Sequence, residues 1–403
     1  MSTFRGEPHS SPAVDYSPSS PAVTETVDEL LTVLSGAPYD FVLARHVSHL
    51  TTQTGSELQI GNVTIVPENG TAQNPVRRIR REIPCADKAW KRIAPNPFRK
   101  PHSLLIAREA VEEPGFRTGS TLREVLDRFV LVTCLLRCCT VQPNYEVAGT
   151  STAITHIPAT YKDLASDEWV SVLRRTIRLT GDEGEAIAAL SKLIDDADIK
   201  REGMIRTSFD AALKKFSRLD DTTDPFEQLV DLATALESVV LGGSKENEGL
   251  TLRLSSRVAA LLAADDDPAQ VLFNDVRQLY SLRSVIVHGG ELTEKTFRKT
   301  LNAISGVPSE SEETNTLVML GHAIDRLRDI LRRSILARLC LAAGPDPLWP
   351  LKGDNTPVDA VLSDEQNRAT WRAHWRKHLT VLEVGYAADR ARPAVFSLGP
   401  EDR

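Results

Sequence analysis

An arginine and a histidine five positions apart are the residues with the clearest chemical potential. Arg283 and His288 stand at the end of an apolar stretch that Gly289 and Gly290 close. An arginine fork binds phosphate oxygens, and a histidine titrates near neutrality and moves protons. Because RNA carries its own nucleophile, the ribose 2′-hydroxyl, these two groups are sufficient in principle to cleave RNA without a metal ion.

Both residues fall on one predicted helix. Asp267-Pro268 starts it, with an N-cap residue followed by proline at the first helical position. Gly289 is the expected stop, because glycine favours the turn that ends a helix. Four apolar residues at helical spacing form the buried seam: Leu272, Val276, Leu279 and Ile286.

A polar face lies beside this seam. Tyr280, Ser284 and His288 recur on it every four residues, with Arg277 one turn behind. Successive residues turn by about 100°, so Arg283 lies roughly 140° from His288 around the helix axis. A long arginine side chain still reaches a phosphate bound near the helix end.

The same residues have a structural alternative. Arg283 would pair with a carboxylate of a neighbouring helix, such as Glu237, and His288 would only cap its own helix. For an arbitrary arginine and histidine at this spacing the structural alternative is the more common one. The surrounding sequence therefore has to decide between the two.

Three separated blocks match a known family in the right order. They are Ala235-Leu236-Glu237, the segment 248–259 (EGLTLRLSSRVA), and the segment 279–290 (LYSLRSVIVHGG). On these residues the region 203–341 resembles the HEPN superfamily, in particular its Apea-like branch. The resemblance implies a helical bundle that often forms a homodimer, in which two such arginine–histidine motifs meet at a cleft and cleave RNA without a metal ion.

Carried onto this chain, the resemblance makes Arg283 and His288 the catalytic pair, with Ser284, Tyr280 and Glu237 in support. Many nucleases of the family have Asn, Asp or His directly after the arginine, where this chain has the weaker polar group of Ser284. The first hypothesis is a metal-independent endoribonuclease, with the role in bacterial defence or as a toxin that recurs in the family. The alternative is a non-catalytic HEPN interaction or sensor protein that dimerises and binds RNA or a protein partner.

A basic segment in the N-terminal half is a second candidate for RNA contact. Residues 77–100 hold an excess of arginine and lysine, with Trp90 and Phe98 interleaved. Cations neutralise phosphates and aromatic rings stack on bases. The alternative, a solvated loop anchored by two aromatics, is the more common fate of such a charge run. The candidate RNA-binding residues are Arg277, Arg78, Arg81, Lys91 and Arg92.

Two pairs of histidines are spaced closely enough along the chain to be considered as metal ligands. His374 and His378 are four residues apart on a predicted helix, but they lack the glutamate of the H-E-x-x-H motif and an evident third ligand. His46 and His49 are a still weaker candidate for a metal site. No metal and no other cofactor is therefore expected.

The composition of the chain argues against several other classes of protein. The net charge of −7 argues against a surface that coats nucleic acid non-specifically. The five cysteines contain no Cys-x-x-Cys pair, which is typical of a reducing cytoplasm and not of a zinc site or a disulfide framework. No apolar run approaches the roughly 20 residues of a membrane span, and the Ser- and Pro-rich N-terminus does not read as a signal peptide. A cytoplasmic protein is expected.

The expected fold class is α+β, a mixed N-terminal α/β region followed by an all-α antiparallel helical bundle. Residues 57–66 are β-branched around a Gly-Asn pair and predict a hairpin. Thr121 and Glu124 form a capping box and predict a helix start. The expected boundaries are a disordered tail over 1–24, a mixed domain over 25–165, a HEPN-like helical domain over 166–345 and a C-terminal extension over 346–403.

Overall fold

The computed structural model of this 403-residue chain describes most of its middle. The described residues are 24, 27, 39–68, 75–83, 102–111, 118–139, 141–151, 160–163, 176–197, 207–217, 224–242, 249–290, 293–309, 311–313, 315–351 and 357–384.

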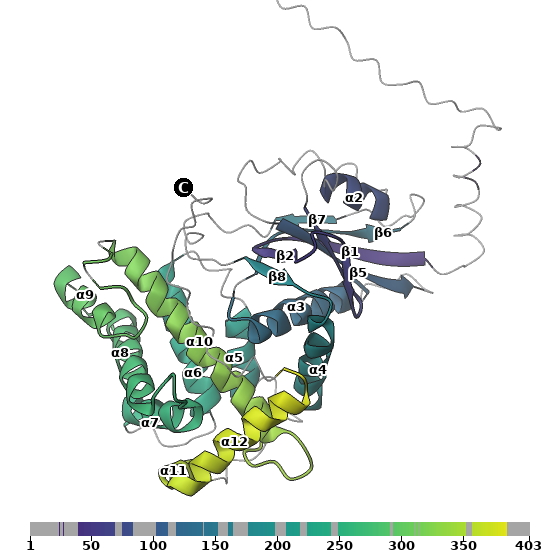
Figure 1. The fold of residues 1–403 in the computed structure, drawn as a ribbon. Coiled ribbons are helices and arrows are strands. Elements are labelled where there is room, and N and C mark those ends of the chain that lie inside the picture. The colour runs from purple at the N-terminus through teal and green to yellow at the C-terminus, as the bar shows by residue number, and fades with distance from the viewer. Residues whose placement is uncertain are drawn as a thin grey trace, which may run out of the picture.

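A six-stranded antiparallel sheet forms the N-terminal half (Figure 1). Its order is β3-β4-β5-β1-β6-β7, so the first strand in the sequence lies near the middle. The strands are β1 (Tyr39–Ser48), β3 (Leu58–Ile60), β4 (Val63–Pro67), β5 (His102–Val111), β6 (Gln142–Thr150) and β7 (Thr160–Asp163). A separate parallel pair joins β2 (Leu50–Thr52) to β8 (Ile177–Leu179).

The sequence correctly predicts one hairpin of this sheet, but it misplaces the start of helix α3. The expected hairpin over 57–66 is confirmed, since β3 and β4 pair antiparallel and Gly61 takes a positive φ of 54° at the turn. The predicted capping box at Thr121 and Glu124 is wrong as a helix start. Helix α3 begins at Thr118, so Thr121 lies inside the first turn and is not the N-cap.

Helices cover both faces of the sheet, as alternation along its strands requires. Leu43 and Val47 of β1 join the core that includes α3 (Thr118–Leu136), and α4 (Glu183–Asp196) packs beside α3. Val42 and Ala44 point to the opposite face and cluster with Ile79 of α2 (Pro75–Glu82). In Figure 1 the sheet accordingly lies between α2 and α3.

The C-terminal half is a helical bundle around one long helix, α10 (Thr316–Ala342), which contacts α6, α7 and α12. The fold class is therefore α+β as predicted. None of the described helices is long and apolar enough to cross a membrane. The other helices of the bundle are α5 (Ser208–Ser217), α6 (Pro225–Val240), α7 (Leu250–Leu262), α8 (Ala269–Val287), α9 (Glu294–Asn302), α11 (Val358–Ser363) and α12 (Glu365–Val381).

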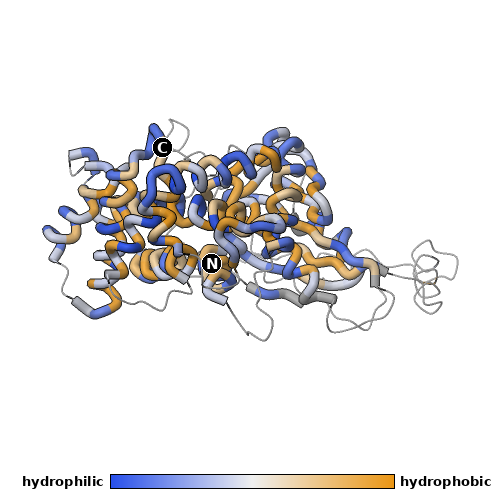
Figure 2. Tube along the Cα trace, turned by 90° about the horizontal axis from the view of Figure 1, so that it is seen from below, coloured by the Kyte–Doolittle hydropathy of each residue, from blue (hydrophilic) through white to orange (hydrophobic). Residues whose placement is uncertain are grey.

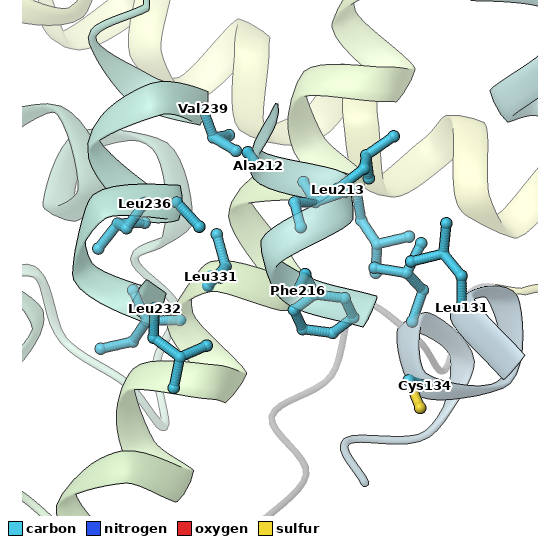
Figure 3. Packing of buried hydrophobic residues seen from close by; sticks show 14 of the residues in the cluster. Leu131, Cys134, Ala212, Leu213, Phe216, Leu232, Leu236, Val239 and Leu331 are labelled. Carbon is cyan, nitrogen blue, oxygen red and sulfur yellow. The ribbon is translucent and has the colours of Figure 1, made fainter. Parts of the chain in front are cut away.

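One hydrophobic core joins the two halves. Figure 3 shows Leu131 of α3 near Phe216 of α5, with Leu236 of α6 and Leu331 of α10 further along the same cluster. All four side chains are at least nine-tenths buried. Hydrophobic segments accordingly run through both halves, and hydrophilic segments gather on the outside (Figure 2). The sheet and the bundle are thus packed against each other through α3.

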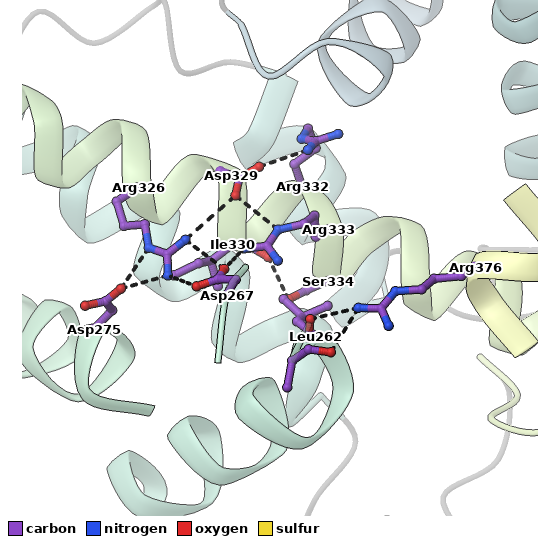
Figure 4. A network of polar contacts seen from close by, with 11 residues as sticks. Leu262, Asp267, Asp275, Arg326, Asp329, Ile330, Arg332, Arg333, Ser334 and Arg376 are labelled. Carbon is purple, nitrogen blue, oxygen red and sulfur yellow. Dashed lines mark hydrogen bonds and ion pairs between the residues drawn. The ribbon is translucent and has the colours of Figure 1, made fainter. Parts of the chain in front are cut away.

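Buried ion pairs anchor α10 (Figure 4). Arg326 binds Asp267 and Asp275, with the shortest nitrogen–oxygen distance to each at 2.8 Å. Arg333 bridges Asp267 and Asp329, at 2.7 and 3.0 Å. The expectation that Asp267 caps α8 is therefore wrong. The N-cap is Pro268, and the Asp267 carboxylate is fully buried against the arginines instead.

Candidate functional site

The C-terminal end of α8 presents the predicted catalytic pair. The helix ends in a Schellman turn, in which the Gly289 N–H donates to the Ile286 carbonyl at 3.3 Å and the Gly290 N–H to the Val285 carbonyl at 2.9 Å. Gly289 has a φ of 66°, in the left-handed region that glycine adopts without strain. The predicted stop is confirmed, and the backbone alone satisfies the end of the helix.

His288 is the C-cap residue of α8, and its side chain is exposed. Its backbone N–H donates to the Ser284 carbonyl at 3.1 Å. Within the described part of the chain the imidazole makes no hydrogen bond and no ion pair. Because backbone groups cap the helix, the imidazole is left facing solvent.

Arg283 lies half-buried against Tyr280, one turn before it on α8. The guanidinium carbon is 5.3 Å from the centre of the Tyr280 ring, a cation–π distance. Its Nε is buried and has no hydrogen-bond partner, and no ion pair is found for it in the described ranges. Arg283 is thus held in place by an aromatic face, and its charge is not neutralised by a carboxylate there.

Glu237 of α6 takes a different partner from the one that the structural alternative predicted. The Tyr280 hydroxyl donates to Glu237 Oε2 at 2.8 Å, which links α6 to α8. Burial, the hydrogen bond to Glu237 and the negative charge of Glu237 raise the pKa of Tyr280 to about 12. The phenol therefore stays protonated at neutral pH and keeps donating.

The structure does not gather all the predicted site residues in one place. Arg277 is exposed on α8, and Ser284 is half-buried between it and the helix end. On α2, Arg78 pairs with Glu57 and Glu82, each at 2.9 Å, whereas Arg81 is exposed. Lys91 and Arg92 lie outside the described residues. Helices α2 and α8 stand in opposite halves of the molecule (Figure 1).

The histidine pairs of the sequence do not form metal sites in the described ranges, where no three His, Cys, Asp or Glu side chains are grouped to hold a metal ion. The rings of His374 and His378 stack with centroids 6.4 Å apart on α12. Burial and the neighbouring His374 lower the pKa of His378.

A polar cluster on the sheet was missed at the level of sequence. It brings His46 of β1 next to His102 of β5 and Tyr145 of β6, with ring centroids 4.9 and 4.7 Å away. In the sequence alone, His46 stands out only for its spacing from His49. A polar residue on the buried face of each strand was the signal that could have indicated this cluster. It can be recognised only when the pairing of the strands is known, because that pairing brings these residues together.

No family model, no curated protein and no solved structure matches this chain. The assignment of a function therefore rests on the residues and their geometry.

Proposed function

We propose that the helical half of this protein is a HEPN-type endoribonuclease that cleaves RNA without a metal ion. Arg283 would bind the scissile phosphate, and His288 would move the proton. The observation that carries the proposal is the state of Arg283, whose charge has no carboxylate partner in the described part of the chain, next to an exposed histidine on the same helix.

The chemistry follows from the two side chains. His288 accepts the proton of a ribose 2′-hydroxyl, and the oxygen attacks the adjacent phosphorus. The bond from phosphorus to the 5′-oxygen breaks, and that oxygen takes up a proton. Arg283 stabilises the extra negative charge of the five-coordinate transition state through its N–H donors. The products are a 2′,3′-cyclic phosphate and a 5′-hydroxyl.

Tyr280 and Glu237 have a positioning role in this proposal. The Tyr280 ring supports the Arg283 guanidinium, and the hydrogen bond to Glu237 fixes that ring against α6. Glu237 accepts from Tyr280 and does not pair with Arg283 directly, so the positive charge of Arg283 remains available to a phosphate.

A homodimer is part of the proposal, by analogy with the family. Two copies of α8 would bring two His288 side chains to one cleft, so that one accepts and the other donates a proton. Sedimentation equilibrium tests this directly. A chain that stays monomeric at the concentration at which it cleaves RNA would remove the dimer from the proposal.

The test of the function is a comparison of variants with matched controls. His288→Ala and Arg283→Ala should lose cleavage of a structured RNA in EDTA, each by ~100-fold or more, as expected for a proton-transfer group and a charge-stabilising donor. His374→Ala and Arg372→Ala, on the distant helix α12, are the controls and should cleave like wild type. Thermal unfolding of all four must match wild type for the comparison to count. Full cleavage by either α8 variant would contradict the proposal.

The second candidate, a HEPN module that only binds a partner, is favoured by one observation. Val287, directly before His288, is 47% exposed, so an apolar side chain lies on the surface beside the candidate site. If this surface binds a protein or RNA without cleaving it, Val287→Asp should abolish binding while His288→Ala leaves it intact.

A further inference from the structure

A buried polar centre lies at one end of the sheet. β1 and β4 end there, and their antiparallel neighbours β5 and β6 begin there. Four strands therefore deliver polar groups to one place, on the sheet face that also carries α2. The residues are Ser48 and His46 from β1, Glu68 after β4, His102 from β5 and Asn144 from β6. Ser48, His46 and His102 are all more than nine-tenths buried.

Hydrogen-bond matching sets the direction of protons in this centre. The Asn144 amide nitrogen lies 2.9 Å from Ser48 Oγ and 2.9 Å from His46 Nδ1, and an amide N–H can only donate. Ser48 Oγ accepts from Asn144, and its own proton has two acceptors within reach, Asn144 Oδ1 at 3.3 Å and His102 Nδ1 at 3.0 Å. The shorter contact is the one to His102. His102 Nδ1 is then an acceptor, positioned as the general base of a serine nucleophile is.

Glu68 supplies a negative charge to the two imidazoles. Its backbone N–H donates to the His102 carbonyl at 2.9 Å, which fixes it beside β5, and its carboxylate lies 3.7 Å from His46 Nε2. The hydrogen bond with His46 and the charges of His46 and His102 lower the pKa of Glu68 in spite of its burial. Its side chain is 35% exposed, so the centre reaches solvent on this side.

Backbone strain marks the same position. His49 directly follows Ser48 and has a φ of 67°, although it is not glycine and is 3% exposed. Its carbonyl accepts from the Ile177 N–H at 2.8 Å, so the conformation is held between β1 and β8. A buried non-glycine residue in the left-handed region costs free energy, and such residues concentrate at functional sites.

We propose that Ser48, His102, Asn144 and Glu68 form a second reactive centre, in which Ser48 accepts an acyl group from a small ester. This activity is independent of RNA cleavage by α8. The near-complete burial of Ser48 restricts the acyl group to a small one, such as acetyl. His46 contributes by holding Glu68 and by stacking on His102.

The proposed step balances without any further reactant than water. The Ser48 oxygen bonds to the carbonyl carbon while its proton passes to His102 Nδ1. The carbonyl electron pair moves to oxygen and returns to carbon in the next step. The bond to the leaving alcohol then breaks, and that alcohol takes the proton from His102. Water repeats the sequence on the acyl-serine, which releases the acid and restores Ser48.

The test uses the full chain with two probes, p-nitrophenyl acetate and a serine-reactive fluorophosphonate. Mass spectrometry of the peptides should find the adduct on Ser48. His102→Gln should slow labelling by ~100-fold or more, the usual contribution of a general base.

Two further variants keep the result interpretable. Ser103→Ala is the matched control, because Ser103 is fully buried on β5 but donates only to the Leu50 carbonyl, at 2.8 Å. It should label like wild type. Ser48→Cys retains a nucleophile if Ser48→Ala fails to fold, and its acetyl adduct should move to the thiol. The proposal is overturned if folded wild type takes no label at Ser48, or if His102→Gln labels as fast as wild type.

Discussion

Arg283 of α8 and three arginines of α10 differ in their carboxylate partners. On α10, Arg326, Arg332 and Arg333 are almost completely buried, and each binds at least one aspartate. On α8, Arg283 is half-buried over a tyrosine ring and has no carboxylate partner in the described part of the chain. A fourth arginine of α10, Arg338, also stacks on an aromatic ring, that of Trp349, but it donates to the backbone carbonyls of Trp349 and Pro350. The three arginines that bind aspartate hold helices together.

A carboxylate partner in the core is the criterion that separates these three arginines from Arg283. A buried charge costs several kcal/mol unless it is paired, so evolution of a stable core favours the pairing seen on α10. Arg283 lies against an aromatic face and binds no carboxylate in the described part of the chain, so it contributes less to the stability of the fold. In the proposed function its anion is the RNA phosphate.

The largest expected effect is a loss of stability when a buried ion pair of α10 is removed. Arg333→Ala leaves Asp267 and Asp329 as buried charges that have lost a partner, and should lower the free energy of unfolding by about 3–5 kcal/mol. Urea unfolding measures this. The control is Arg298→Ala, which removes an ion pair with the exposed Glu294 on α9 and should cost about 0.5 kcal/mol or less. Equal losses would contradict the contrast between buried and exposed pairs.

The next largest effect is a loss of RNA cleavage when Arg283 of α8 is replaced. Arg283→Gln should reduce RNA cleavage by ~100- to 1000-fold, the cost of removing one donor to a developing charge. Its free energy of unfolding should change by less than about 1 kcal/mol, because no carboxylate in the described part of the chain loses a partner. A loss of stability similar to that of Arg333→Ala would show that Arg283 is structural too.

Acid should weaken the α10 network. Burial raises the pKa of Asp267 and Asp329, but the surrounding arginines outweigh it and lower both values below the usual 3.8. Their contribution is therefore complete above that value and is lost as pH falls through the lowered pKa values. Asp275 opposes this, since burial raises its pKa. Unfolding followed below pH 4 should show a net loss that Arg333→Ala no longer shows in full.

The smallest effect belongs to the tyrosine that connects α6 and α8. Tyr280→Phe keeps the ring under Arg283 and removes only the hydrogen bond to Glu237. The expected cost is about 1 kcal/mol of stability. Cleavage should fall only a few-fold, because Arg283 keeps its aromatic support. Tyr280→Leu, which removes the ring, should reduce cleavage more than Tyr280→Phe, and the opposite order would remove Tyr280 from the site.

Local signals in the sequence were sufficient for much of the fold. The Asp224-Pro225 pair marks the start of α6, and the Asp224 side chain accepts from the Phe226 N–H as expected of an N-cap. The glycines after His288 mark the end of α8. Such signals act over one helical turn, so they can be read without knowing the tertiary structure.

Contacts between distant segments could not be read in this way. Asp267 has the sequence context of an N-cap, yet it binds Arg326, 59 residues away, because α7, α8 and α10 meet there. Glu237 and Tyr280 were placed on neighbouring helices, but their hydrogen bond depends on how α6 crosses α8. The polar centre around Ser48 likewise requires the pairing of four strands.

The most direct test of the central claim is the chemistry of the RNA ends produced by purified wild-type protein in EDTA. If Arg283 and His288 act on the 2′-hydroxyl and the phosphate, every cut should leave a 2′,3′-cyclic phosphate and a 5′-hydroxyl, and a 2′-deoxy substitution at the cut site should abolish that cut. Products with a 3′-hydroxyl and a 5′-phosphate, or cleavage that survives the 2′-deoxy substitution, would contradict it.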